Sequence, residues 1–167
     1  LALIGIRARG VPLAERLASE IETIAGVRVP TGALDITLYR DDLQTIAKQP
    51  VVRSTQIPVS IVDTNVILVD DMVDAAGTLT KAAAMMVEQG ASSVRAMCTH
   101  AVLSGEACQR IQESKLLELV VTDTIPVPAS KLEAAPKIKQ LSVAQLFADV
   151  IQRVRHHESI SSHFIIA

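Results

Sequence analysis

Residues 66–80 read Val66-Ile-Leu-Val-Asp-Asp-Met-Val-Asp-Ala-Ala-Gly-Thr-Leu-Thr80. The apolar residues at the start of this stretch, 66–69, are typical of a buried strand, and the adjacent carboxylates Asp70 and Asp71 follow them directly. Small residues come next, and a helical pattern then extends over residues 78–89. A buried strand that leads through a short loop into a helix is the repeating unit of parallel α/β folds.

The same alternation of apolar runs and helical patterns continues through the rest of the chain. It predicts an α/β fold with a doubly wound, mostly parallel sheet flanked by helices, in a single domain over residues 1–167. We expect strands at 1–6, 33–39, 66–69, 94–99, 117–121 and 138–142, and helices at 12–25, 78–89, 105–113 and 143–156. The connection of residues 40–56 is too long for a tight turn, and connections of this length are usually functional or mobile.

The composition narrows the class of protein. With 167 residues, 49% of them hydrophobic, the chain is long enough to bury a core and is not an intrinsically disordered sequence. Its net charge of −2, one Tyr, two Phe and no Trp argue against a nucleic-acid partner. No apolar run approaches the roughly 18 residues of a membrane span, and no leader sequence opens the chain. We therefore expect a cytoplasmic protein without membrane contact.

The stretch after the central strand carries the clearest chemistry. In open parallel sheets, ligands bind beyond the carboxyl ends of the strands. Small residues let backbone amides approach an anion closely, and the predicted helix start at Gly77-Thr78 offers unpaired N–H groups. Asp70 and Asp71 would repel a phosphate, so they should face hydroxyl groups or a magnesium ion. A phosphate site beside a hydroxyl site describes a sugar phosphate.

A simpler interpretation is that Asp70, Asp71 and Asp74 only cap a solvated helix start. Capping needs one carboxylate, whereas two in a row directly after a buried strand favour a binding site. Two other phosphate sites are excluded by their motifs, because no G-x-G-x-x-G follows the first predicted strand and no G-K-[ST] of a Walker A loop occurs.

The pattern of four apolar residues, Asp-Asp, a short run and Gly-Thr resembles the phosphoribosyl diphosphate (PRPP) motif of type I phosphoribosyltransferases. Residues 1–63, with Leu3-Ile-Gly-Ile-Arg-Ala-Arg-Gly-Val-Pro-Leu-Ala14, are similar to the pyrimidine-operon attenuator protein that is also a uracil phosphoribosyltransferase. Residues 64–164, with Thr99-His-Ala-Val-Leu-Ser-Gly105, are similar to the C-terminal half of ribose-phosphate diphosphokinase, the PRPP synthetase. The two resemblances imply one type I phosphoribosyltransferase-like domain, a chimera joined near residues 63–66.

The resemblance also implies roles for individual residues. Asp70 and Asp71 would hold the ribose hydroxyls, and magnesium would bind with the substrate. The 5-phosphate would lie on the loop formed by Asp74, Ala75, Ala76, Gly77 and Thr78. The pyrophosphate would lie on the loop formed by Arg7, Ala8, Arg9 and Gly10, and Arg40 falls in the segment of the catalytic flap. The families usually have Thr where Ala8 and Ala75 stand, so each departure removes a hydroxyl donor to phosphate.

We therefore expect a phosphoribosyl-binding domain that recognises PRPP or ribose 5-phosphate with magnesium. Two other functions remain open: an active phosphoribosyltransferase that transfers the phosphoribosyl group to a nucleobase, and an engineered fold-recombination scaffold without activity. PRPP synthesis is not expected, because the resemblance does not include the half of the synthetase that binds ATP. The apolar residues 164–166 and the assembly of both families into oligomers favour a homo-oligomer.

Overall fold

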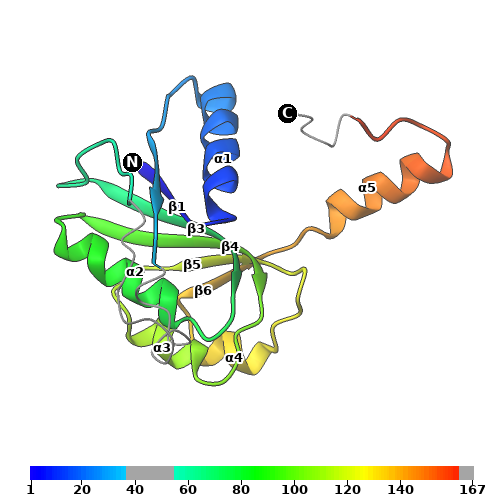
Figure 1. Ribbon diagram of the computed structural model, residues 1–167. Helices are drawn as coiled ribbons and strands as arrows, with labels where there is room; N and C mark the ends of the chain where they lie inside the picture. Colours follow the sequence, from blue (N-terminus) through cyan, green and yellow to red (C-terminus); the bar gives the residue numbers. More distant parts are fainter. Residues whose placement is uncertain (37–54, 162–167) are drawn as a thin grey trace, which may run out of the picture.

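The computed structural model describes residues 1–36 and 55–161, which form a sheet of six strands in the order β2-β1-β3-β4-β5-β6 (Figure 1). The strands are β1 (Ala2–Ile6), β2 (Thr31–Leu34), β3 (Asn65–Val73), β4 (Ser93–Ala101), β5 (Leu119–Thr122) and β6 (Ile138–Leu141). The helices are α1 (Gly10–Ala25), α2 (Gly77–Glu88), α3 (Ala107–Glu113), α4 (Ala129–Ala134) and α5 (Ala144–Arg155). All neighbouring strands pair in parallel, so the predicted α/β class with a parallel sheet is confirmed.

Three elements differ most from the prediction. The strand expected at 66–69 continues as β3 through both aspartates to Val73, which pairs in register with Ala101. The helix α4 has only six residues, too few to give a periodic apolar pattern in the sequence. The strand expected at 33–39 corresponds to β2, which begins two residues earlier and ends at Leu34, and residues 37–39 lie outside the described part of the chain.

The direction in which the chain adds strands to the sheet reverses between β1 and β3. From β1 the chain passes outward to β2 at one edge, and it then returns to the other side of β1 as β3, from which β4, β5 and β6 follow in order. Gly5 of β1 is in register with Val69 of β3, so the segments that follow these two strands emerge side by side. In doubly wound sheets, ligands bind at such a switch point.

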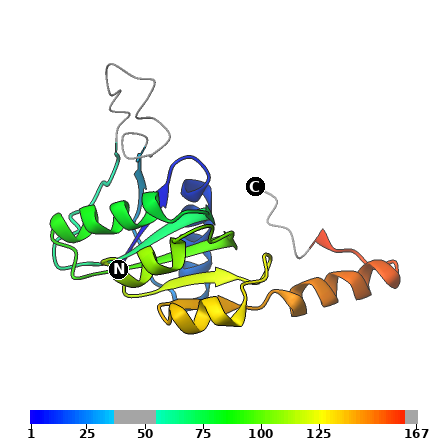
Figure 2. The same cartoon turned by 90° about the horizontal axis from the view of Figure 1, so that it is seen from below.

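The helices cover both faces of the sheet. Figure 1 shows α1 on one face and α2, α3 and α4 on the other. Under α1, Leu13 and Leu17 pack against Leu3 and Val69. On the opposite face a larger core includes fully buried side chains such as Leu68 and Met86, which come from β3 and α2. Both views show α5 extending away from the end of β6 (Figures 1 and 2). Among the described helices, none is long and apolar enough to cross a membrane.

The start of α1 lies directly against the backbone of β3. A Cβ atom on Gly10 would collide with the carbonyl oxygen of Val69, and one on Gly5 would collide with the backbone of Val11. Only glycine at these positions lets the helix begin so close to the strand. This contact fixes the loop between β1 and α1 beside the residue that follows Val69, which is Asp70.

Candidate functional site

Asp70 and Asp71 lie within β3 and are both half-buried. The Oδ1 atom of Asp70 accepts a hydrogen bond of 2.9 Å from the backbone N–H of Asp71. Asp70 is in register with Cys98 of β4 and lines a cavity of about 280 Å³ between α1 and the sheet, a cavity whose lining includes none of residues 74–78. The sequence predicts that the two carboxylates leave the end of the strand, whereas the structure holds them on paired, ordered backbone.

The aspartate pair also influences a neighbouring thiol. Burial raises the pKa of Cys98 well above its usual range, and the negative charges of Asp70 and Asp71 raise it further. The Cys98 side chain therefore stays a neutral thiol, as expected for an inert cysteine in the core.

The two arginines of the loop after β1 point to different partners. The Nη1 atom of Arg9 lies 3.3 Å from Oδ2 of Asp71, so this side chain reaches the aspartate pair of β3. Arg7 instead donates a hydrogen bond of 3.5 Å to Oε1 of Gln56. Of the two arginines predicted to hold pyrophosphate, the structure brings only Arg9 to Asp71.

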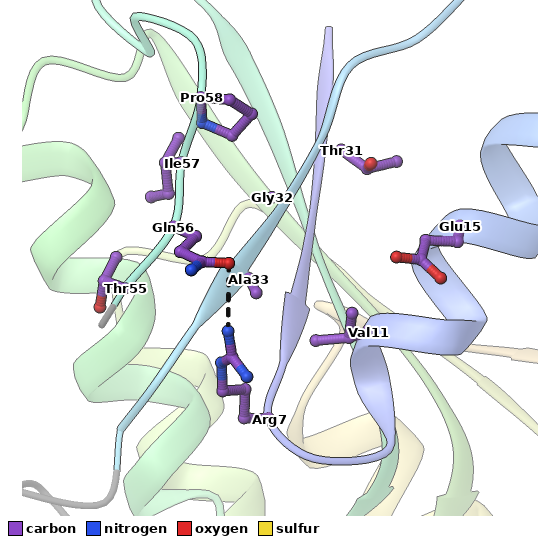
Figure 3. Close-up of a pocket in the computed structure, with 10 residues that line it drawn as sticks. All are labelled: Arg7, Val11, Glu15, Thr31, Gly32, Ala33, Thr55, Gln56, Ile57 and Pro58. Carbon is purple, nitrogen blue, oxygen red and sulfur yellow. Dashed lines mark hydrogen bonds between the residues drawn. The ribbon is translucent and has the colours of Figure 1, made fainter. Parts of the chain in front are cut away.

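Arg7 and Gln56 line a cavity of about 580 Å³ between β2, the start of α1 and residues 55–58 (Figure 3). The other residues that line it are Val11, Glu15, Thr31, Gly32, Ala33, Thr55, Ile57 and Pro58. Gln56 is held there by two backbone hydrogen bonds with Ala33, of 2.8 and 2.9 Å. The cavity therefore lies against β2, and Figure 3 shows the guanidinium of Arg7 directed toward Gln56.

The remaining residues of the same loop have distinct positions. Ala8 is exposed and joined to Arg7 by a cis peptide bond. Gly10 is buried as the first residue of α1, where it makes the close approach to Val69. Arg40, predicted to belong to a flap, lies outside the described residues.

The loop predicted to hold the 5-phosphate ends in an uncapped helix. Ala76 adopts the left-handed conformation, with φ of 62°, and α2 begins at Gly77. No side chain caps this start, and the first turn contains no acidic residue. The first N–H groups of a helix have no partner within the helix, and together with the helix dipole they form a site for an anion. The backbone of residues 76–78 therefore has the properties that a phosphate site requires.

The two hydroxyl groups of this helix start behave differently. The hydroxyl of Thr80 donates back to the carbonyl oxygens of Ala76 and Gly77, at 3.0 and 3.1 Å, so it is not directed at a ligand. The hydroxyl of Thr78 forms no hydrogen bond with the described residues. Thr78 is therefore the one of the two that can add a donor to an anion.

Two carbonyl groups of the same loop accept hydrogen bonds from residues outside the loop. The N–H of Ser104 donates to the carbonyl of Asp74 at 3.2 Å, and Nη1 of Arg110 donates to the carbonyl of Ala75 at 3.1 Å. These bonds engage the carbonyl oxygens of Asp74 and Ala75 with groups outside the loop. The contact of Arg110 with the candidate loop was missed by the sequence reasoning, because Arg110 lies 35 residues from Ala75 and no local pattern links them.

His100 lies near the carboxyl end of β4, at the same edge of the sheet as the aspartate pair. Its Nδ1 atom is 2.9 Å from the hydroxyl of Thr124, and the hydroxyl of Thr124 in turn donates to the carbonyl of Thr99 at 3.1 Å. His100 is in register with Met72, the residue that follows Asp71 in β3. Polar side chains therefore extend along this edge of the sheet from the aspartate pair of β3 to His100 on β4 and Thr124 after β5.

Comparison with known proteins places the chain in a family. A model described as the Phosphoribosyl synthetase-associated domain matches residues 14–165. A ribose-phosphate pyrophosphokinase of Campylobacter jejuni is 58% identical over 103 residues, which are 62% of this chain and 32% of that protein. A bifunctional protein PyrR of Deinococcus radiodurans is 51% identical over 90 residues, which are 54% of this chain and 49% of that protein. Because the two matches together exceed the length of the chain, they overlap.

A solved structure shows the same arrangement of elements. The phosphoribosylpyrophosphate synthetase of Mycobacterium smegmatis superimposes with a TM-score of 0.71 at 29% identity, over 93% of this chain and 45% of that one. The chain therefore spans about a third to a half of the length of these relatives. The similarity to two kinds of protein that the sequence predicts is confirmed.

Proposed function

The chain belongs to the phosphoribosyl synthetase-associated domain family, and from this premise we propose that it binds PRPP or ribose 5-phosphate at the switch point of the sheet. The observation that carries the proposal is the uncapped start of α2, with Gly77 and Thr78, directly after the aspartates of β3. A cationic or neutral ligand would gain nothing from the α2 start, and a plain phosphate would gain nothing from the aspartates. The relatives' names, ribose-phosphate pyrophosphokinase and phosphoribosylpyrophosphate synthetase, agree with this chemistry.

The proposed roles follow the charges of the groups. The 5-phosphate accepts hydrogen bonds from the N–H groups of residues 76–78 and from the hydroxyl of Thr78. The ribose hydroxyls donate to the carboxylates of Asp70 and Asp71. Because Asp70 already bonds to the backbone of Asp71, its carboxylate is oriented before the ligand arrives.

Magnesium fits this site as a companion of the substrate. The described residues contain no group of three or more His, Cys, Asp or Glu side chains that could hold a metal ion by themselves. Magnesium in proteins is often bound by one or two carboxylates together with substrate phosphates and water, and Asp70 and Asp71 supply that number. When bound, the ion would neutralise the charge of a pyrophosphate group beside the aspartates.

Arg9 is the residue that would respond to a pyrophosphate group. Arg9 pairs with Asp71, and its side chain is 82% exposed, so the pair contributes little stability. A bound pyrophosphate offers Arg9 a stronger, charge-assisted partner. This residue supports the second candidate function, transfer of the phosphoribosyl group to a nucleobase, for which release of pyrophosphate from PRPP in the presence of a base is the test.

The proposed binding is tested by thermal unfolding with a series of ligands. A ligand that binds only the folded state at a hundred times its Kd stabilises by roughly 2.7 kcal/mol. For a chain of this size, PRPP or ribose 5-phosphate should then raise the Tm by about 5–10 °C. Ribose should have far less effect, because the phosphate contact is missing. An equal shift with ribose and ribose 5-phosphate would contradict the proposal, and no shift with any ligand would favour a scaffold without activity.

The aspartates are tested in the same assay. The double variant Asp70→Asn, Asp71→Asn should lose most of the shift that ribose 5-phosphate gives and keep the small response to inorganic phosphate. A full ribose 5-phosphate response in this variant would show that the carboxylates do not hold the sugar.

A further inference from the structure

The loop between β3 and α2 is attached to the segment after β4 through consecutive carbonyl groups. The N–H of Val102 donates to the carbonyl of Val73 at 3.0 Å, and the N–H of Ser104 donates to the carbonyl of Asp74 at 3.2 Å. The next carbonyl, that of Ala75, receives no backbone N–H from the described residues and is bound by a side chain instead. The backbone series therefore ends one residue short of Ala76, where the loop turns into α2.

The side chain that completes the series is Arg110 of α3. Its Nη1 atom donates to the carbonyl of Ala75 at 3.1 Å, and its Nη2 atom lies 3.6 Å from Oε2 of Glu106. One guanidinium can serve both groups because its N–H donors are arranged in a fixed plane. Arg110 therefore joins the loop to α3 through a single, oriented contact.

The residue after this carbonyl has an unusual backbone. Ala76 is 5% exposed and has a φ of 62°, in the left-handed region that alanine rarely adopts. Its carbonyl oxygen accepts hydrogen bonds from the N–H and the hydroxyl of Thr80, both at 3.0 Å. Its own N–H donates to no acceptor among the described residues. Because backbone N–H groups of buried residues are nearly always paired, this N–H is available to a ligand.

We propose that Arg110 is a positioning residue for the 5-phosphate, because it holds the peptide unit of Ala75 and Ala76 so that the N–H of Ala76 faces the anion. This proposal rests on the sugar-phosphate function proposed above. The peptide bond is trans, so its C=O and its N–H point to opposite sides of the chain. A donor that fixes the carbonyl of Ala75 therefore also fixes the direction of the N–H of Ala76.

The charge of Arg110 adds to this effect. A hydrogen bond on the C=O of a peptide polarises the unit and makes its N–H a better donor. A left-handed alanine persists only where its surroundings hold it, and Arg110 is one of the groups that do so. Without this contact the peptide unit is free to rotate, and the N–H of Ala76 loses its direction. Arg110 thus acts through Ala75 and not by touching the ligand.

The test is calorimetric titration of ribose 5-phosphate into the full chain and its variants. Arg110→Met keeps a long side chain without a donor and should raise the Kd by about fivefold, the effect of one hydrogen bond. Arg110→Lys keeps a cationic donor and should recover most of this loss. Arg95→Met is the matched control, because Arg95 is 41% exposed against 44% for Arg110, is also paired with a glutamate, and gives the same change of net charge. It should leave the Kd unchanged.

Amide resonances in nitrogen–proton correlation spectra provide a readout that a purely structural role would not move. In the original chain, the amide proton of Ala76 should shift downfield when ribose 5-phosphate binds, because its N–H donates to the phosphate. In Arg110→Met at saturating ligand this shift should be lost, whereas the amides of Gly77 and Thr78 should still respond.

Three outcomes would overturn the role of Arg110 alone. Equal Kd values for Arg110→Met and Arg95→Met would show that the contact with Ala75 does not affect binding. Equal losses in Arg110→Lys and Arg110→Met would show that the donor to this carbonyl is not what matters. A full downfield shift of Ala76 in Arg110→Met would show that the peptide unit keeps its direction without the arginine.

Failure of the sugar-phosphate function itself gives a different result. In that case the original chain does not bind ribose 5-phosphate, and the amides of residues 76–78 do not respond to it. The role of Arg110 then falls together with the function on which it rests.

Discussion

The two helices that begin at the switch point of the sheet, α1 and α2, start in opposite ways. Neither start has a side-chain cap or an acidic residue in its first turn. At α1 the first residue, Gly10, is buried against the carbonyl of Val69, so the helix start is filled by the protein itself. At α2 no side chain caps the first turn, whose N–H groups have no partner within the helix, and the carbonyls of the preceding loop bond to Ser104 and Arg110. The same local chemistry thus serves packing in one case, and in the other we propose that it binds the 5-phosphate.

The largest expected effect is on the packed helix start. Gly10→Ala should lower the free energy of unfolding by about 3 kcal/mol or more, because the added carbon meets backbone that cannot move without shifting α1. Ala75→Thr, in the open loop before α2, should change the same quantity by less than about 0.5 kcal/mol, since Ala75 is exposed. Urea unfolding measures both. Similar losses in the two variants would erase the distinction between a filled and an open helix start.

The next effect separates the two arginines after β1. Arg9→Ala should weaken PRPP binding by roughly tenfold while leaving ribose 5-phosphate binding nearly unchanged, because only PRPP has the pyrophosphate that Arg9 can reach. Arg7→Ala is the matched control, since Arg7 points to Gln56 and should cost less PRPP affinity. Calorimetric titration gives both constants. A larger loss in Arg7→Ala than in Arg9→Ala would show that the loop rearranges when the ligand binds.

The smallest effect concerns the hydroxyl that the open loop lacks. Ala75→Thr should tighten binding of ribose 5-phosphate by about threefold to tenfold, because the net contribution of one added hydrogen bond is roughly 0.5–1.5 kcal/mol. Unchanged affinity would place the side chain of residue 75 away from the phosphate. Ala8→Thr, in the other loop, should act on PRPP alone.

Much of the fold could be predicted because the apolar runs are long and regular. The strand before the aspartates, the helix that follows it and the parallel sheet are all local patterns, and the structure confirms them. The extension of β3 through Asp70 and Asp71 was not predictable from periodicity, because pairing with β4 as far as Ala101 overrides the polar side chains.

The candidate site could be predicted only where its residues are continuous in the sequence. The loop of residues 74–78 forms one segment, whereas the bond from Arg110 to Ala75 and the pair of Arg9 with Asp71 join residues that are 35 and 62 positions apart. The sequence also treats Arg7 and Arg9 as equivalent, and only the folded loop turns them to different partners. Likewise, the apolar pattern of α5 predicts a helix correctly but carries no information on what covers it.

The most direct test of the central claim is a calorimetric titration of ribose 5-phosphate into two variants at one position. Thr78→Asp places a carboxylate in the first turn of α2, where it stabilises the helix and repels a phosphate. Thr78→Asn introduces a side chain of the same size as aspartate but without its charge. If the 5-phosphate lies on the start of α2, Thr78→Asp should lose binding by at least a hundredfold with an unchanged or raised Tm, and Thr78→Asn should bind within about tenfold of the original chain. Equal affinities in Thr78→Asp and Thr78→Asn would show that the phosphate lies elsewhere.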